Sequence, residues 1–195
     1  MSAFNSDIII VSTGYLNTVN DTVIGNQAGV TGVSKFGGQL GKVLQVSAEQ
    51  IGQMFDSSVG TLYSGNYQYV QLSSSIGTPA PEIGQLLFWD YSAGLSNFIV
   101  TDTKDETSTP TPAGVYIGGI EAGNYGFIYT GPGLVNGLFG ALTNAASTGQ
   151  GLVVTSAGLF DNASPVNPTY VGYAEALPVA HALKLVKLAN LSLLG

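Results

Sequence analysis

Residues 113–133 read AGVYIGGIEAGNYGFIYTGPG, and this stretch decides the fold class. Its two runs rich in aromatic and β-branched residues, 114–120 and 125–130, have the composition of strands. Gly123 lies just before the second run and Gly126 at its start, where a tight hairpin turn needs residues without a side chain. The stretch therefore predicts two short strands joined by a turn.

The same pattern recurs along the chain. The 27 glycines follow no triplet period but separate short apolar runs, which favours many tight turns and excludes collagen. Several short strands at such spacing are typical of a barrel or a sandwich. We expect a mainly β fold, a small β-barrel of β-tulip-like form or a sandwich, with an extended N-terminal arm and one short helix. Further strands are predicted at 42–46, 67–72, 85–90, 97–102, 151–155, 170–174 and 182–188.

The pattern divides the chain into three regions. Residues 1–34 are predicted to be an extended arm, residues 35–78 a strand–helix–strand region, and residues 79–195 the β-barrel-like domain. The boundary is placed in the loop 73–81, because Pro, Gly and Ser at this density interrupt regular structure. The helix is predicted at 48–57.

The helix prediction rests on a capping signal. Ser47 precedes Gln50 by three residues, which is the spacing of a capping box. Ile51, Met54 and Phe55 follow at positions that share one face of a helix.

The arm carries apolar residues near its start, followed by a polar remainder rich in Asn, Thr and Gly. Such a segment cannot build a core alone, so we expect its apolar tip to insert into a neighbouring subunit or to add a strand to its sheet. The alternative is an unattached terminus. The candidate interface residues are Phe4, Ile8, Ile9, Ile10, Val11, Tyr15 and Leu16.

Composition points to assembly with other proteins. Charged residues make up 9% of the chain, whereas an ordinary soluble domain has about 25%. A surface with so few charges would make a poorly soluble monomer, so we expect partner subunits to cover much of it. A homo-oligomer is predicted on this ground.

The charges exclude one large class of function. The net charge is −7 and the chain has no Arg, whereas nucleic-acid binding requires clustered cations. There is no Cys, so no disulfide or thiolate site can form. The apolar run 8–11 is too short for a signal-peptide core or a membrane span, so we expect a soluble product of the cytoplasm that binds no membrane.

Catalytic and metal sites find little support in the sequence. His181 is the only histidine and no Gly-x-Ser-x-Gly motif occurs, so a serine hydrolase is not expected. A strand or rim position is predicted for His181. A pair of carboxylates could serve a glycosidase, but the densest group lies in an exposed Thr/Pro-rich loop and departs from calcium-loop spacing. We expect no enzyme activity, no cofactor and no metal. The carboxylates considered are Glu82, Asp90, Asp102, Asp105 and Glu106.

Two further motifs have a simpler structural interpretation. Gly131 to Gly137 superficially resembles a dinucleotide-binding loop, but its glycine spacing is wrong and no helix follows, so a hairpin turn is predicted. Clustered aromatic residues could form a platform for sugars, although aromatic alternation on a strand more often marks a core or an interface. These residues are Phe88, Trp89, Tyr125, Phe127 and Tyr129.

Three stretches resemble proteins of tailed-bacteriophage heads. Residues 113–133 are similar to a recurring pattern in which a strand leads through aGxyGxI into a second strand and a Gly turn. Residues 151–158 and 170–176 resemble the end of the same small β-barrel proteins, where a G-x-L-V strand and an (I/V)-G-x-A strand precede a closing strand. The likeness covers residues 82–190 and leaves the arm outside.

This resemblance implies a capsid decoration or head-stabilising protein, commonly trimeric and seated between capsid hexamers. The expected function is therefore a structural virion protein on the capsid exterior that binds and stabilises the major capsid protein. Two other hypotheses remain open. The chain could be a glycan-binding module of a head or tail fibre, with its aromatic strands exposed, or a virion-associated glycosidase.

Overall fold

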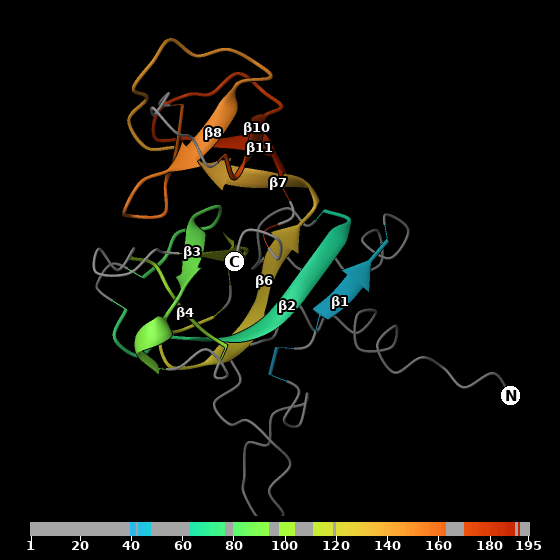
Figure 1. Cartoon of the computed structure of the whole chain (residues 1–195), viewed down its shortest axis with the longest axis vertical. Helices are drawn as coiled ribbons and strands as arrows, with labels where there is room; N and C mark the ends of the chain where they lie inside the picture. Colours follow the sequence, from blue (N-terminus) through green and yellow to red (C-terminus); the bar gives the residue numbers. More distant parts are fainter. Residues whose placement is uncertain are drawn as a thin grey trace, which may run out of the picture.

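A computed structural model gives the fold of the chain (Figure 1). It describes residues 40–41, 43–47, 63–76, 80–93, 98–103, 111–118, 120–162, 170–189 and 191. The predicted arm 1–34 with its seven interface residues, the predicted helix 48–57, and the carboxylates of Asp105 and Glu106 lie outside this range.

The described residues are mainly β, as predicted. One short 3-10 helix, η1 (Tyr91–Ala93), accompanies the strands. The strands are β1 (Val43–Val46), β2 (Gly65–Leu72), β3 (Leu86–Trp89), β4 (Ile99–Thr101), β5 (Pro112–Tyr116), β6 (Tyr125–Gly131), β7 (Gly133–Leu138), β8 (Gly151–Val154), β9 (Phe160–Asp161), β10 (Gly172–Ala174) and β11 (Leu183–Leu188).

Five strands close into a barrel. The order is β2-β4-β3-β5-β6, and β6 pairs back onto β2, so the sheet has no free edge around this ring. All neighbours are antiparallel except β2 and β4, which are parallel. β1 pairs with the first half of β2 as an additional strand. The barrel therefore combines a strand that precedes the loop 73–81 with strands that follow it.

The inside of the barrel is filled by one set of buried side chains. All five strands contribute to it, as the interior of a closed sheet requires. Gly114 of β5 also lies at this cluster. Glycine is required at this position because a Cβ would come within 2.7 Å of the Tyr129 carbonyl oxygen. The members are Val70, Leu72, Leu87, Val100, Ala113, Tyr116, Ile120 and Ile128.

A second sheet has the order β7-β11-β10-β8-β9. It curls until its two edge strands meet, where Phe139, directly after β7, forms an isolated bridge with Phe160 in β9. The hairpin turn predicted for Gly131 to Gly137 is wrong beyond its first residues. The chain turns at Gly131 and Pro132, but β7 starts at Gly133 and continues into this second sheet.

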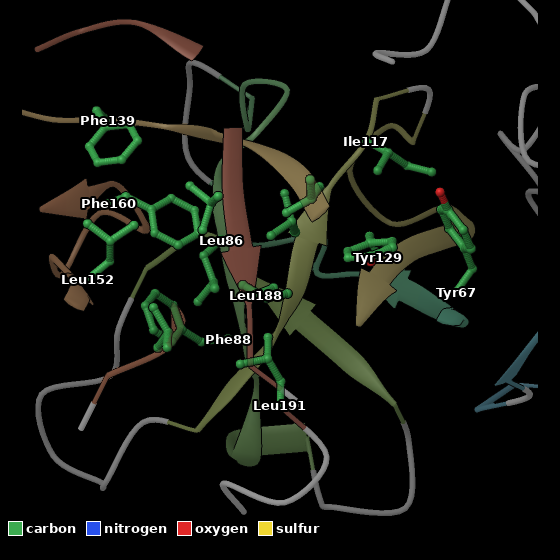
Figure 2. Close-up of a cluster of buried hydrophobic side chains, with 14 of the residues drawn as sticks. Tyr67, Leu86, Phe88, Ile117, Tyr129, Phe139, Leu152, Phe160, Leu188 and Leu191 are labelled. Atoms are coloured by element: carbon green, nitrogen blue, oxygen red, sulfur yellow. The ribbon is translucent and has the colours of Figure 1, made fainter. Parts of the chain in front are cut away.

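A second hydrophobic core, separate from the barrel interior, joins the barrel to the second sheet. Figure 2 shows side chains from both, such as Tyr129 of the barrel and Phe160 of the second sheet, in the same cluster. Backbone hydrogen bonds join them as well: the Leu138 amide donates to the Gly84 carbonyl, and the Leu86 amide to the Gly158 carbonyl, both at 2.8 Å. The two sheets therefore fold as one packed unit.

Two buried tyrosines predict an alkaline limit to stability. Burial raises the pKa of Tyr129 to about 12, and raises that of Tyr67 further still. An unfolded tyrosine ionises near pH 10, so above about pH 10 ionisation favours the unfolded chain and stability falls until the folded pKa is reached. The free energy of unfolding from urea titrations should decline above about pH 10. The decline should be shallower in Tyr129→Phe, and an identical slope in that variant would contradict this assignment.

Candidate interaction surface

Exposed apolar side chains are concentrated on one hairpin. Six large hydrophobic residues of the described chain are exposed, and four of them belong to the β10–β11 hairpin and its connection. Leu177, Val179 and Leu183 lie at the turn end of this hairpin and are called the tip patch below; Leu177 is 53% exposed. Tyr173 is the fourth, on β10.

The sequence holds the tip patch in a defined conformation. The amides of Glu175 and Ala176 both donate to the Leu185 carbonyl, at 3.0 and 3.1 Å, which fastens the start of the connection to β11. Its end is bound to the second sheet, because the Phe139 amide donates to the Ala182 carbonyl at 3.1 Å. Pro178, between the exposed Leu177 and Val179, is buried. The patch is therefore displayed on an anchored turn.

The outward face of the second sheet continues the apolar surface away from the tip. Lys187 of β11 lies opposite Leu134 of β7 on one side and opposite Tyr173 of β10 on the other. Residues opposite each other on neighbouring strands point to the same face, so these three side chains form a row across the sheet. Leu134 and Tyr173 are exposed at 38% and 51%.

This surface is locally different in charge from the rest of the chain. The segment 172–188 carries two of the five lysines, Lys184 and Lys187, but only one of the twelve carboxylates, Glu175. A chain of net charge −7 thus presents a slightly cationic, largely apolar face at this hairpin.

A polar network fixes the neighbouring loop 140–150. The Asp161 carboxylate accepts hydrogen bonds from the Thr143 amide at 3.0 Å and the Thr143 hydroxyl at 2.6 Å. Asn162 is almost fully buried; its side-chain oxygen accepts from the Asn144 amide at 2.9 Å, and its Nδ2 donates to the Asn144 carbonyl at 2.7 Å. Because these buried polar groups are paired, they rigidify the loop instead of forming a reactive site.

The residues considered for chemistry do not come together. His181 is exposed in the turn before β11, at a positive φ of 55°, and so occupies the rim. Asp102, predicted in an exposed loop, is buried instead at the end of β4. The part of the chain that the structure describes contains no group of three side chains suited to a metal ion.

The aromatic residues proposed as a sugar platform are mainly core residues. Phe88, Phe127 and Tyr129 are at most 3% exposed, and Tyr125 and Trp89 are half-buried against the core clusters. The structure thus contradicts exposure of these rings as a set. A different aromatic pair, to which no sequence motif pointed, is formed by the exposed Tyr173 and the partly buried Tyr170, with ring centroids 6.4 Å apart.

Comparison with known proteins gives a likeness among solved structures. No protein-family model matches the sequence, and no curated protein matches it. Among solved structures, the chain is similar to the N-terminal base of the head fibre protein gp8.5 of bacteriophage phi29, with a TM-score of 0.44 and 14% sequence identity. The match covers 64% of this chain and 93% of the other. No helix among the described residues is long and apolar enough to cross a membrane.

Proposed function

We propose that the chain is a non-enzymatic structural protein of a tailed-phage virion. In this proposal it decorates the capsid exterior by binding the major capsid protein, stabilises the shell, and assembles as a homotrimer. The observation that carries the proposal is the tip patch: three exposed aliphatic side chains held on an anchored turn. Exposed apolar side chains grouped on one turn favour a protein contact site.

Composition supports an apolar mode of attachment. With only five lysines and no arginine, the chain has few charges with which to form interfacial ion pairs. Burial of apolar area is then the main available source of binding free energy. The sequence resemblance to phage head proteins supports the identity of the partner, since its three stretches coincide with β5 to β6, with β8 and with β10.

The test removes apolar area from the tip patch. Leu177→Ser combined with Leu183→Ser should weaken cosedimentation with empty capsids of the phage that carries the gene. Each buried leucine contributes about 1.5–3 kcal/mol, so the pair should reduce the affinity at least about a hundredfold. Binding curves measured by ultracentrifugation, with light scattering to follow the oligomeric state, give the result.

Val43→Ser is the matched control. Val43 is 51% exposed, close to the values of the tip residues, but lies on β1 at the barrel. It should bind capsids as the wild type does. Equal affinity for the double variant and for Val43→Ser would remove the tip patch from the interface, and absence of capsid binding by the wild type would overturn the proposed function.

A further inference from the structure

The pair of the exposed Tyr173 and the partly buried Tyr170 is a second feature of the outward face, separate from the tip patch. Tyr173 pairs with Lys187 near the open end of the β10–β11 hairpin, whereas the tip patch lies at its turn end. The planes of the two rings are inclined to each other by 35°, and their centroids lie 6.4 Å apart. They form a small aromatic floor on the surface.

A glycine beneath this floor is required by its geometry. Gly151 of β8 lies opposite Tyr173 in the sheet. A Cβ at Gly151 would come within 2.6 Å of the Tyr170 ring, so the ring occupies the space that a side chain would take. The sequence thereby brings Tyr170 beside Tyr173.

The polar side chains near the rings have no hydrogen-bond or ion-pair partner among the described residues. Tyr173 has Lys187 as its cross-strand neighbour, and Glu175 follows two residues later on the same strand path. Within the described residues, the side chains of Glu175 and Lys187 and the two phenol hydroxyls form no hydrogen bond or ion pair. Near Tyr173 there are thus donors and acceptors that have no protein partner within the described part of the chain.

We propose that Tyr170 and Tyr173 form a binding platform for a neutral sugar, with Glu175 and Lys187 as polar partners at its edge. A pyranose presents polarised C–H bonds on one face and hydroxyls around its rim. Its C–H groups are attracted to the electron-rich face of an aromatic ring, and a few polar groups then fix its orientation. Lys187, opposite Tyr173, and Glu175, two residues after it, carry opposite charges, which favours a neutral, hydroxyl-rich ligand over a charged one.

The proposal goes beyond capsid attachment because it uses different residues and a different ligand. The test applies saturation-transfer NMR to the full chain with three probes: tetramers of β-1,4-linked N-acetylglucosamine, β-1,4-linked glucose and α-1,4-linked glucose. The wild type should transfer saturation to the C–H protons of at least one tetramer. Tyr173→Ala and Tyr170→Ala should each weaken that binding by about tenfold, because each removes one ring face.

Two controls separate sugar binding from other effects. Tyr173→Phe keeps the ring and should retain most of the binding, and Val43→Ser, on β1 at the barrel, should leave it unchanged. The proposal is overturned if none of the three tetramers receives saturation, or if binding persists undiminished in both alanine variants. Loss of capsid binding in Tyr173→Ala without sugar binding by the wild type would assign the platform to the protein interface and also overturn it.

Discussion

Substitution of Gly158 by alanine is expected to destabilise the protein by several kcal/mol. Gly158 has a φ of +70°, and a Cβ there would lie 2.1 Å from the Leu86 carbonyl oxygen. The positive φ alone costs a non-glycine residue on the order of 1–3 kcal/mol. The clash is with backbone, so it can be relieved only by moving the turn away from β3.

That movement would break contacts between the two sheets. The Leu86 amide donates to the Gly158 carbonyl at 2.8 Å, and the Gln85 side chain donates to the Ala157 carbonyl at 2.7 Å. Both bonds hold the turn between β8 and β9 against the barrel. Gly158→Ala should therefore lower the denaturant midpoint strongly, or prevent folding.

Gly149→Ala is the matched control. Gly149 has nearly the same φ, +73°, but a Cβ there meets nothing within 4 Å. It should pay only the conformational cost, on the order of 1 kcal/mol. Unfolding free energies from urea titrations compare the two variants. Equal losses would mean that backbone conformation, not contact with β3, makes Gly158 necessary.

The sequence was sufficient to predict the strand content. Strands rich in Val, Ile and aromatic residues and separated by glycines were placed correctly to within a few residues, as β6 at Tyr125–Gly131 against a predicted 125–130 shows. Gly172 was expected to allow close backbone approach, and a Cβ there would indeed lie 2.6 Å from the Lys187 carbonyl oxygen. A requirement of this kind can be predicted from the sequence because it depends on the identity of a single residue.

Two strands were missed for physical reasons. β7 reads GLVNGL, and its two glycines and its asparagine have the composition of a turn. Gly137 is in the strand because a Cβ there would come within 2.8 Å of the Phe160 ring and of Val186. That contact joins residues distant in sequence and leaves no local signal. β9 has only two residues, too few for any periodic pattern.

The pairing of the strands and the identity of the exposed residues could not be predicted from the sequence either. β2 and β6 are buried on both faces, so neither shows the alternation that would reveal an inward and an outward side. The parallel pairing of β2 with β4 depends on closure of the whole barrel. The near-alternating stretch before Leu188 predicted a strand correctly, but it did not show that Leu183 faces solvent while Val186 is buried.

Removal of the Phe160 ring is the second substitution expected to have a large effect. Phe160 is fully buried and packs against Phe139, with ring centroids 5.9 Å apart, where the edges of the second sheet meet. Phe160→Ala should lower the free energy of unfolding by about 3–5 kcal/mol, since it removes apolar contacts and leaves a cavity. Tyr173→Ala, at an exposed aromatic residue, is the control and should cost far less.

A double-mutant cycle with Gly137 tests the cause of this effect. In the wild type, Gly137→Ala forces a Cβ against the Phe160 ring and Val186. In the Phe160→Ala background the contact with the ring is gone and only that with Val186 remains, so Gly137→Ala should cost less there, with a coupling free energy on the order of 1 kcal/mol. Unfolding free energies of the four proteins give the coupling directly. Additive losses would show that the Phe160 ring does not exclude a side chain at position 137. In that case Val186 alone would be the reason why β7 requires Gly137.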